Sequence, residues 1–149
     1  MNILALDCGT KTGWAVARDG KLVESGVSVF ELKRGDKGMR FFRFRSWLED
    51  LVKMSKPDVI YYEQAHYRGG AATALGVGMA TRVQEVASVA GISYASVHTG
   101  TLKKHATGRG NSAKPMMIAA AKERWRVEPE DDNEADALCI LAYAIDDIG

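Results

Sequence analysis

The chain has 149 residues, of which 46% are hydrophobic and 26% are charged, and its formal net charge is +1 at pH 7. These values are typical of one soluble globular domain, residues 1–149, with a core of its own. No apolar stretch of the sequence approaches the roughly 20 residues that a membrane span needs. The two cysteines, Cys8 and Cys139, form no CxxC pair, so we expect a reducing, cytoplasmic location and no structural zinc site.

The first third of the chain predicts three antiparallel strands and a helix. The apolar segment NILALD at 2–7 ends on Asp7, and GWAVAR at 13–18 follows it as a hairpin partner. A third strand is predicted at 22–30. The roughly helical spacing of apolar residues over 37–54 predicts an amphipathic helix.

The rest of the chain predicts two more strands and the helices around them. The segment PDVIYYE ends on Glu63, again a carboxylate after an apolar run. The predicted elements are this strand at 57–63, a closely packed helix at 70–90, a strand at 92–97, helices at 99–106 and 131–146, and between these two a helix capped by Ser112. Together they predict an α/β fold with a mixed five-stranded sheet, three antiparallel strands then two more, flanked by helices.

Two of the predicted strands end on acids. If these strands are neighbours, Asp7 and Glu63 lie side by side at the carboxyl ends of the sheet, where ligand sites tend to lie. Two close carboxylates repel each other, so both stay ionised only around a cation, and oxygen ligands suit Mg²⁺ or Mn²⁺. Taken singly, each acid is also explained as a surface carboxylate or as the cap of a turn.

A second acidic pattern, DDNEADAL, spans residues 131–138. Asp132 and Asp136 are four residues apart and therefore project from the same face of a helix. Acids in a first helical turn also stabilise the helix dipole, which explains Asp132 but not Asp136, since Asp136 lies within an apolar run. With Asp7 and Glu63, this pair predicts a site for two divalent ions about 4 Å apart, suited to phosphodiester cleavage.

Basic residues form two blocks along the chain. Such blocks are either phosphate-binding surfaces or solvated helix faces. The earlier block contains Lys33, Arg34, Lys37, Arg40, Arg43 and Arg45, and the later one contains Lys103, Lys104, Arg109, Lys114, Lys122, Arg124 and Arg126.

Four segments carry a resemblance to a known family. They are ILALDCGTKTGWAV at 3–16, VIYYEQAHY at 59–67, LKKHATGRGNSAK at 102–114 and EADAL at 134–138. In this order they resemble the motifs of the RuvC family of Holliday-junction resolvases, which have the RNase H-like fold of the retroviral integrase superfamily. The resemblance implies a homodimeric endonuclease that resolves four-way DNA junctions with two Mg²⁺ or Mn²⁺ ions per active site, in the cytoplasm of a bacterial or phage-infected cell. The short chain favours a phage-type member.

The resemblance also implies roles for single acids. Asp7, Glu63 and Asp136 match three of the family's metal-binding acids. The fourth acid, a histidine in some members, falls at Asn133 here, which is a departure from the family's pattern. Asp132, one residue earlier, is the candidate replacement.

The family's basic and aromatic residues match further positions. Lys103 and Lys114 match two lysines that lie near the scissile phosphate, and Lys104 is an adjacent alternative. The catalytic set is thus Asp7, Glu63, Asp132, Asp136 and Lys114. The family's wedge aromatic falls at His66, whose ring either stacks on an unpaired base or packs within its loop. The expected DNA-binding residues are His66, Tyr67, Arg68, Lys103, Lys104, Arg109 and Lys114.

Other functions share parts of this pattern. A related nuclease acting on RNA–DNA hybrids, forks or flaps would use the same acids. A catalytically decayed nucleic-acid-binding domain is the second alternative, which Asn133 supports modestly. An ATP-binding sugar-kinase or actin-like domain would need a second lobe for which 149 residues leave no room, and the pattern GxxxxGK[ST] is absent.

Overall fold

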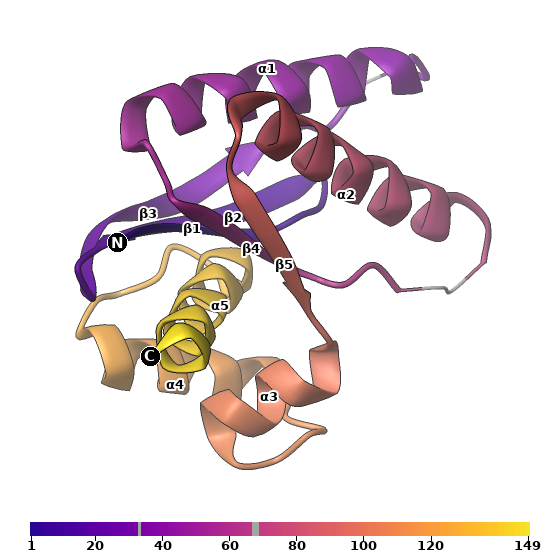
Figure 1. Cartoon of the computed structure of the whole chain (residues 1–149). Coiled ribbons are helices and arrows are strands. Elements are labelled where there is room, and N and C mark those ends of the chain that lie inside the picture. The colour runs from indigo at the N-terminus through magenta and orange to yellow at the C-terminus, as the bar shows by residue number, and fades with distance from the viewer. Residues whose placement is uncertain (33, 67–68) are drawn as a thin grey trace.

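The computed structural model describes residues 1–32, 34–66 and 69–149 of the chain (Figure 1). Within these ranges the chain forms one five-stranded sheet with the order β3-β2-β1-β4-β5. The strands are β1 (Asn2–Asp7), β2 (Lys11–Arg18), β3 (Lys21–Val29), β4 (Val59–Glu63) and β5 (Ser93–Val97). β1, β2 and β3 pair antiparallel, whereas β4 lies parallel to both β1 and β5. The predicted mixed sheet is confirmed.

Helices cover both faces of the sheet (Figure 1). The helices are α1 (Lys37–Ser55) and α2 (Gly70–Ala90) on one face, and α3 (Thr99–Thr107), α4 (Lys114–Trp125) and α5 (Asp132–Ile148) on the other. The helices predicted from the apolar spacing agree with these bounds to within two residues at each end. In the described ranges, none of them combines the length and the apolar composition needed to cross a bilayer.

The two faces of β1 carry different side chains, because successive residues of a strand point to opposite faces. Leu4 and Leu6 pack in the core beneath α1 and α2. Ile3 and Ala5 pack in the other core, against α5. Asp7 continues the series of Ile3 and Ala5, so its side chain belongs to the face that α5 covers.

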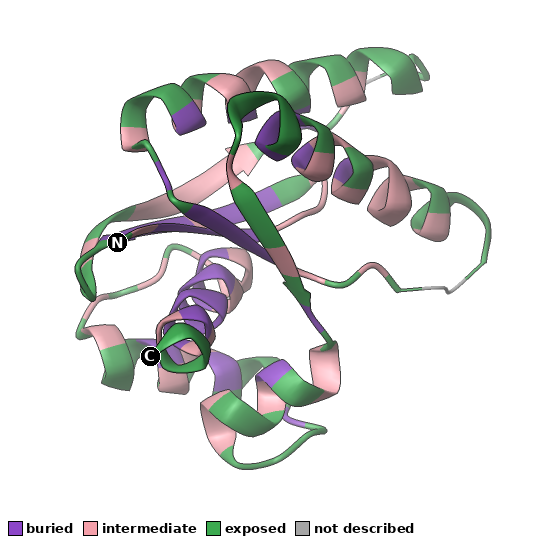
Figure 2. Ribbon diagram, in the orientation of Figure 1, coloured by how far each residue is buried: buried purple, intermediate pink, exposed green. Residues whose placement is uncertain are grey.

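α5 fills the second core and is buried along most of its length (Figure 2). Ala135, Ala137 and Ala144 have no exposed surface, and their small side chains let the helix approach the strands closely. Leu138 and Ile140 are also fully buried in this core. The apolar run that the sequence places here therefore packs against the sheet, as predicted.

A glycine sets the position of α5 on the sheet. A Cβ atom at Gly13 would lie 1.8 Å from the backbone carbonyl oxygen of Asn133, a separation that no side chain could tolerate. Gly13 pairs with Asp7 in the β1–β2 register. The first turn of α5 is thus held against β2 directly beside Asp7, because residue 13 has no side chain.

The predicted cap of α4 is wrong. The residue before α4 is Ala113, and no side chain caps this helix end. Ser112 is buried instead, where its hydroxyl donates to the carbonyl of Arg109 at 2.7 Å and contacts the hydroxyl of Thr107. Ser112 therefore closes the loop between α3 and α4 rather than starting a helix.

The contact at Gly13 predicts the effect of a single methyl group. We expect Gly13→Ala to lower the free energy of unfolding by about 2–3 kcal/mol, because α5 or β2 must move to admit the methyl group. Gly9→Ala is the matched control, since a Cβ at Gly9 would lie 3.6 Å from the Lys11 carbonyl oxygen, an ordinary contact. Urea denaturation measures both. Equal stability of the two variants would contradict this account of the contact.

Candidate active site

Two strand ends place carboxylates next to each other. β1 and β4 are parallel, and Leu6 is in register with Tyr62, so Asp7 and Glu63 follow at the same edge of the sheet. Tyr61 packs in the α5 core, and Glu63, two residues later, points to the same face. The two acids therefore both project toward α5. The two strands are neighbours, so the acids lie side by side as the sequence predicted for that case.

The first turn of α5 is anchored by two acids that have structural roles. Asp131 caps the helix, since its side chain accepts a hydrogen bond from the Glu134 backbone N–H at 2.9 Å. Glu134 is buried and accepts hydrogen bonds from the Ser25 hydroxyl at 2.6 Å and from the Glu130 N–H at 2.7 Å. These bonds tie the helix start to β3 and to the preceding loop, which fixes where Asp132 and Asp136 lie.

The acids of α5 and of the strand ends share one electrostatic environment. Burial raises the pKa of Asp7 well above its usual range, and the charges of Asp136, Glu63 and Asp132 raise it further. Burial also raises the pKa of Asp136 to about 7, with Glu63 and Asp132 adding to the effect. We call Asp7, Glu63, Asp132 and Asp136 the four-acid site.

The donor set of the four-acid site is suited to Mg²⁺ or Mn²⁺, because all four side chains offer hard carboxylate oxygens. As the side chains lie, no three His, Cys, Asp or Glu residues of the described ranges are close enough together to hold one ion. Like charges repel, so these carboxylates approach one another only when a cation lies between them.

Two neighbouring residues, Asp132 and Asn133, are the candidates for the position of the fourth acid. Asn133 donates a hydrogen bond through its side-chain amide to Asp131 at 3.0 Å, and its carbonyl packs on Gly13. Asp132 instead acts electrostatically on both Asp7 and Asp136. The structure therefore places Asp132, rather than Asn133, among the acids.

Two lysines face the four-acid site from separate helices. The charges of Lys103 on α3 and Lys114 at the start of α4 both act to lower the pKa of Asp136. The Lys114 ammonium nitrogen lies 3.3 Å from an Asp132 carboxylate oxygen. Lys104 is exposed and, as the next residue of a helix, points about 100° away from Lys103. Lys103 and Lys114 are thus the lysines that the fold brings to the acids.

The other expected DNA-binding residues are only partly placed. Arg109 is exposed in the loop between α3 and α4. His66 is exposed in the loop after β4, and Tyr67 and Arg68 lie outside the described residues. Lys33 of the earlier basic block also lies outside them.

Thr99, which the sequence predicted only as the start of a helix, also bonds to this site. The Thr99 hydroxyl donates a hydrogen bond to a Glu63 carboxylate oxygen at 2.7 Å. The same hydroxyl lies 2.6 Å from Nε2 of His66. Thr99 thus connects an acid of the four-acid site with the loop that was expected to meet DNA.

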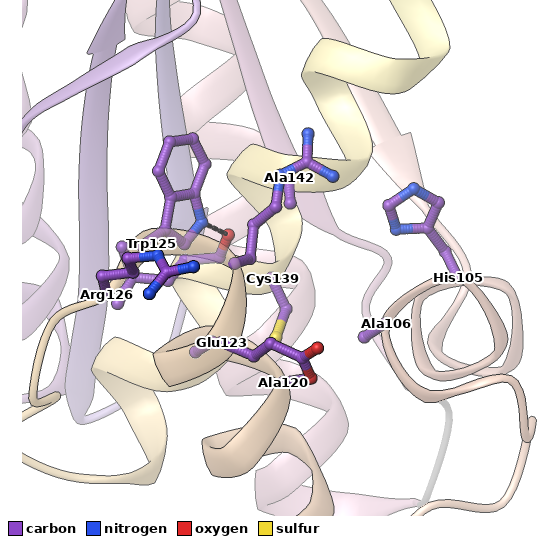
Figure 3. A pocket seen from close by; sticks show the side chains of 11 residues that line it. His105, Ala106, Ala120, Glu123, Trp125, Arg126, Cys139 and Ala142 are labelled. Atoms are coloured by element: carbon purple, nitrogen blue, oxygen red, sulfur yellow. Dashed lines mark hydrogen bonds between the residues drawn. The ribbon is translucent and has the colours of Figure 1, made fainter.

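Pockets among the described residues differ in whether they reach the acids. A pocket of about 210 Å³ lies beside Asp7 and Glu63 and extends past His66 to Gly76 of α2, so it adjoins the acids. A pocket of about 460 Å³ lies between α3, α4 and α5 (Figure 3). Charged and polar side chains such as Glu123, Arg124 and Arg126 line the larger pocket together with alanines and Trp125, and none of the four acids lines it. The smaller pocket is therefore the one that belongs to the candidate site.

Known proteins are similar in sequence to this chain over almost its whole length. No profile of a known protein family matches it. The crossover junction endodeoxyribonuclease RuvC of Anaeromyxobacter sp. strain K is 31% identical over 148 residues, which cover 94% of this chain and 78% of that protein. The chain belongs to the RuvC family. RuvC of Caldanaerobacter subterraneus subsp. tengcongensis is 24% identical over 147 residues, which cover 94% of this chain and 89% of that protein.

A solved RuvC structure has the same fold. Thermus thermophilus RuvC in complex with a Holliday junction substrate matches with a TM-score of 0.82 over 97% of this chain and 93% of that chain, at 21% identity. The likeness confirms the RNase H-like α/β fold that the sequence predicted for this RuvC-family chain.

Two residues of the site were not anticipated from the sequence as parts of it. The signal for Gly13 was present, since a glycine inside a strand marks a close approach of other backbone. No signal was available for Thr99, because its contacts to Glu63 and His66 join residues 36 and 33 positions apart. Their roles follow from tertiary contacts.

The raised pKa of Asp136 predicts how stability depends on pH. In EDTA the pKa of Asp136 in the folded protein is about 7, whereas the ordinary pKa of an aspartate is 3.8. The folded state therefore binds more protons between these values, and the free energy of unfolding falls as the pH rises through this range. We expect Asp136→Asn to flatten the dependence and to stabilise the protein at pH 8 by about 1 kcal/mol or more.

Urea denaturation in EDTA at pH 5 and pH 8 measures this effect. Asp50→Asn is the matched control, because it makes the same change at an exposed position of α1, which covers the face of the sheet opposite to α5. Destabilisation by Asp136→Asn of the same size at both pH values would contradict the prediction, because the raised pKa of Asp136 would then not set the pH dependence.

Proposed function

We propose that this chain is a metal-dependent, structure-specific endonuclease that resolves four-way DNA junctions by hydrolysing phosphodiester bonds. The observation that carries the proposal is the four-acid site, where acids at two parallel strand ends and two acids of α5 act on one another electrostatically. Membership of the RuvC family supports the substrate, since related proteins are named crossover junction endodeoxyribonucleases.

The proposed cofactor is Mg²⁺, with Mn²⁺ as a substitute, and two ions per active site. Asp7, Glu63, Asp132 and Asp136 would hold them. Bound there, such ions lower the pKa of water and stabilise charge on the leaving oxygen. The chain's own contribution is to hold four carboxylates at one edge of a rigid sheet, on elements whose backbones are fixed by core packing.

The lysines have a separate role in the proposed reaction. A site of four carboxylates repels DNA, so nearby cations are needed to bring a phosphate close. Lys103 and Lys114 face the acids and would bind the scissile phosphate and stabilise the charge that develops on it. Lys114 is thereby the catalytic lysine of the proposal, with Lys103 beside it.

Residues around the site would bind the rest of the junction. Lys104 and Arg109 are exposed next to Lys103 and supply sequence-independent phosphate contacts. His66 lies in the loop after β4, where the RuvC-family resemblance places a wedge residue, and Tyr67 and Arg68 follow it. An aromatic ring at this loop would stack on a base left unpaired at the junction centre.

The proposed assembly is a homodimer. Symmetrical cutting of a four-way junction needs two active sites related by a twofold axis, and a dimer with that symmetry supplies them. We place the enzyme in the cytoplasm of a bacterial or phage-infected cell, a location that the two free cysteines support.

The proposal is tested by cleavage of a four-way junction, a fork, a flap and an RNA–DNA hybrid in Mg²⁺. We expect the wild-type protein to cut the junction at symmetrical positions. Asp7→Asn should lower the cleavage rate by ~10³-fold or more, about 4 kcal/mol in activation free energy, while junction binding remains. Asp50→Asn on α1 is the control and should cut at the wild-type rate.

Each other outcome contradicts part of the proposal. Cleavage of a fork, a flap or a hybrid with the junction left intact would overturn the substrate. Binding without cleavage of any substrate in Mg²⁺ or Mn²⁺ would identify the chain as a decayed binding domain. Full activity of Asp7→Asn would remove the four-acid site from the mechanism.

A further inference from the structure

The Thr99 hydroxyl lies between two side chains to which the proposed function gives different tasks. It donates to a carboxylate oxygen of Glu63 at 2.7 Å and lies 2.6 Å from Nε2 of His66. His66 Nε2 is itself 3.8 Å from the same Glu63 oxygen, beyond hydrogen-bond distance. The threonine is therefore the link between the two.

The number of protons on these groups fixes the direction of the two bonds. A hydroxyl has one proton to donate, and an ionised carboxylate can only accept. Thr99 therefore donates a hydrogen bond to Glu63 and accepts one from His66 through a lone pair. His66 in turn donates through Nε2–H, so this ring nitrogen carries a proton.

The fold holds the Thr99 hydroxyl in a defined place. Thr99 is the first residue of α3, directly after the cap residue His98, whose ring accepts a hydrogen bond from the Gly100 N–H at 3.1 Å. β5 ends at Val97, which is in register with Glu63. A threonine side chain has few rotamers because it is branched at Cβ, so the hydroxyl is aimed at Glu63 with little freedom to turn away.

We propose that Thr99 is a positioning residue of the metal site: its hydroxyl orients the Glu63 carboxylate for ion binding and holds His66 against it. This inference rests on the proposed function of the four-acid site. Groups that hydrogen-bond a ligating side chain set its orientation, and their loss lowers metal affinity by roughly 10–100-fold. Thr99 needs no contact with the ion or with DNA for this role.

The first test is metal binding in the absence of DNA. Thr99→Val removes the hydroxyl and keeps the branched shape, whereas Thr99→Ser keeps the hydroxyl. We expect calorimetric titration with Mn²⁺ to give an affinity about 10-fold weaker for Thr99→Val, and for Thr99→Ser a value within about threefold of wild type. Both variants should unfold at the wild-type urea concentration. Wild-type affinity of Thr99→Val, or equal losses in the two variants, would overturn the role of the hydroxyl.

The second test separates positioning from a structural effect by kinetics. For Thr99→Val we expect the Mg²⁺ concentration that gives half-maximal junction cleavage to rise about 10-fold. At saturating Mg²⁺, kcat should stay within about threefold of wild type, because the reacting groups are intact. A loss of kcat that excess Mg²⁺ does not restore would contradict positioning through Glu63.

The third test concerns the link to His66. In EDTA, His66→Ala and Thr99→Val should each weaken junction binding, and the double variant should bind no more weakly than His66→Ala, since both changes remove one contact. Additive losses would overturn the link. The calorimetric test uses no DNA, so its outcome does not depend on the substrate. If Thr99→Val binds Mn²⁺ about 10-fold more weakly but the wild-type protein leaves the junction uncut, the proposed substrate is contradicted and the role of Thr99 stands.

Discussion

The carbonyl oxygen of Asn133 lies where a side chain at position 13 would have to be, 1.8 Å from the Cβ of any residue larger than glycine. This contact decides where α5 begins on the sheet. Gly13 pairs with Asp7, so the first turn of α5 is brought to the strand end that carries this acid. Glu63 follows from the parallel register of β1 and β4, and Asp132 and Asp136 follow from the helix. The four-acid site thus depends on residue 13 being a glycine.

This contact brings the acids together, and their proximity and burial are electrostatically unfavourable. Burial and mutual repulsion raise the pKa values of Asp7 and Asp136, so the state in which all four acids are ionised is unfavourable in the metal-free protein. The apolar face of α5 and the bonds of Glu134 to Ser25 and to the Glu130 N–H hold the helix in place against this repulsion. A divalent cation would relieve it, which is the physical reason why this arrangement is suited to metal-dependent chemistry.

Much of this could be predicted from the sequence, for reasons that differ between residues. Asp7 and Glu63 end apolar runs, and Asp136 interrupts one, so each is an ionisable group where the local pattern requires an apolar or turn residue. A glycine in a strand was a signal for the close backbone approach at Gly13. Nothing in the local pattern marked Thr99, since its contacts are with residues distant in sequence. The predicted cap of α4 failed for a similar reason, because Ser112 is buried by tertiary contacts with the preceding loop.

The central claim is that the acids of two strand ends and one helix form a single metal site. A crystal structure of the protein soaked in Mn²⁺, with anomalous scattering recorded to locate the ions, tests it most directly. The account predicts manganese bound between Asp7, Glu63 and Asp136, with Asp132 rather than Asn133 as the fourth side chain. Manganese bound elsewhere, or bound by α5 without either strand-end acid, would contradict it.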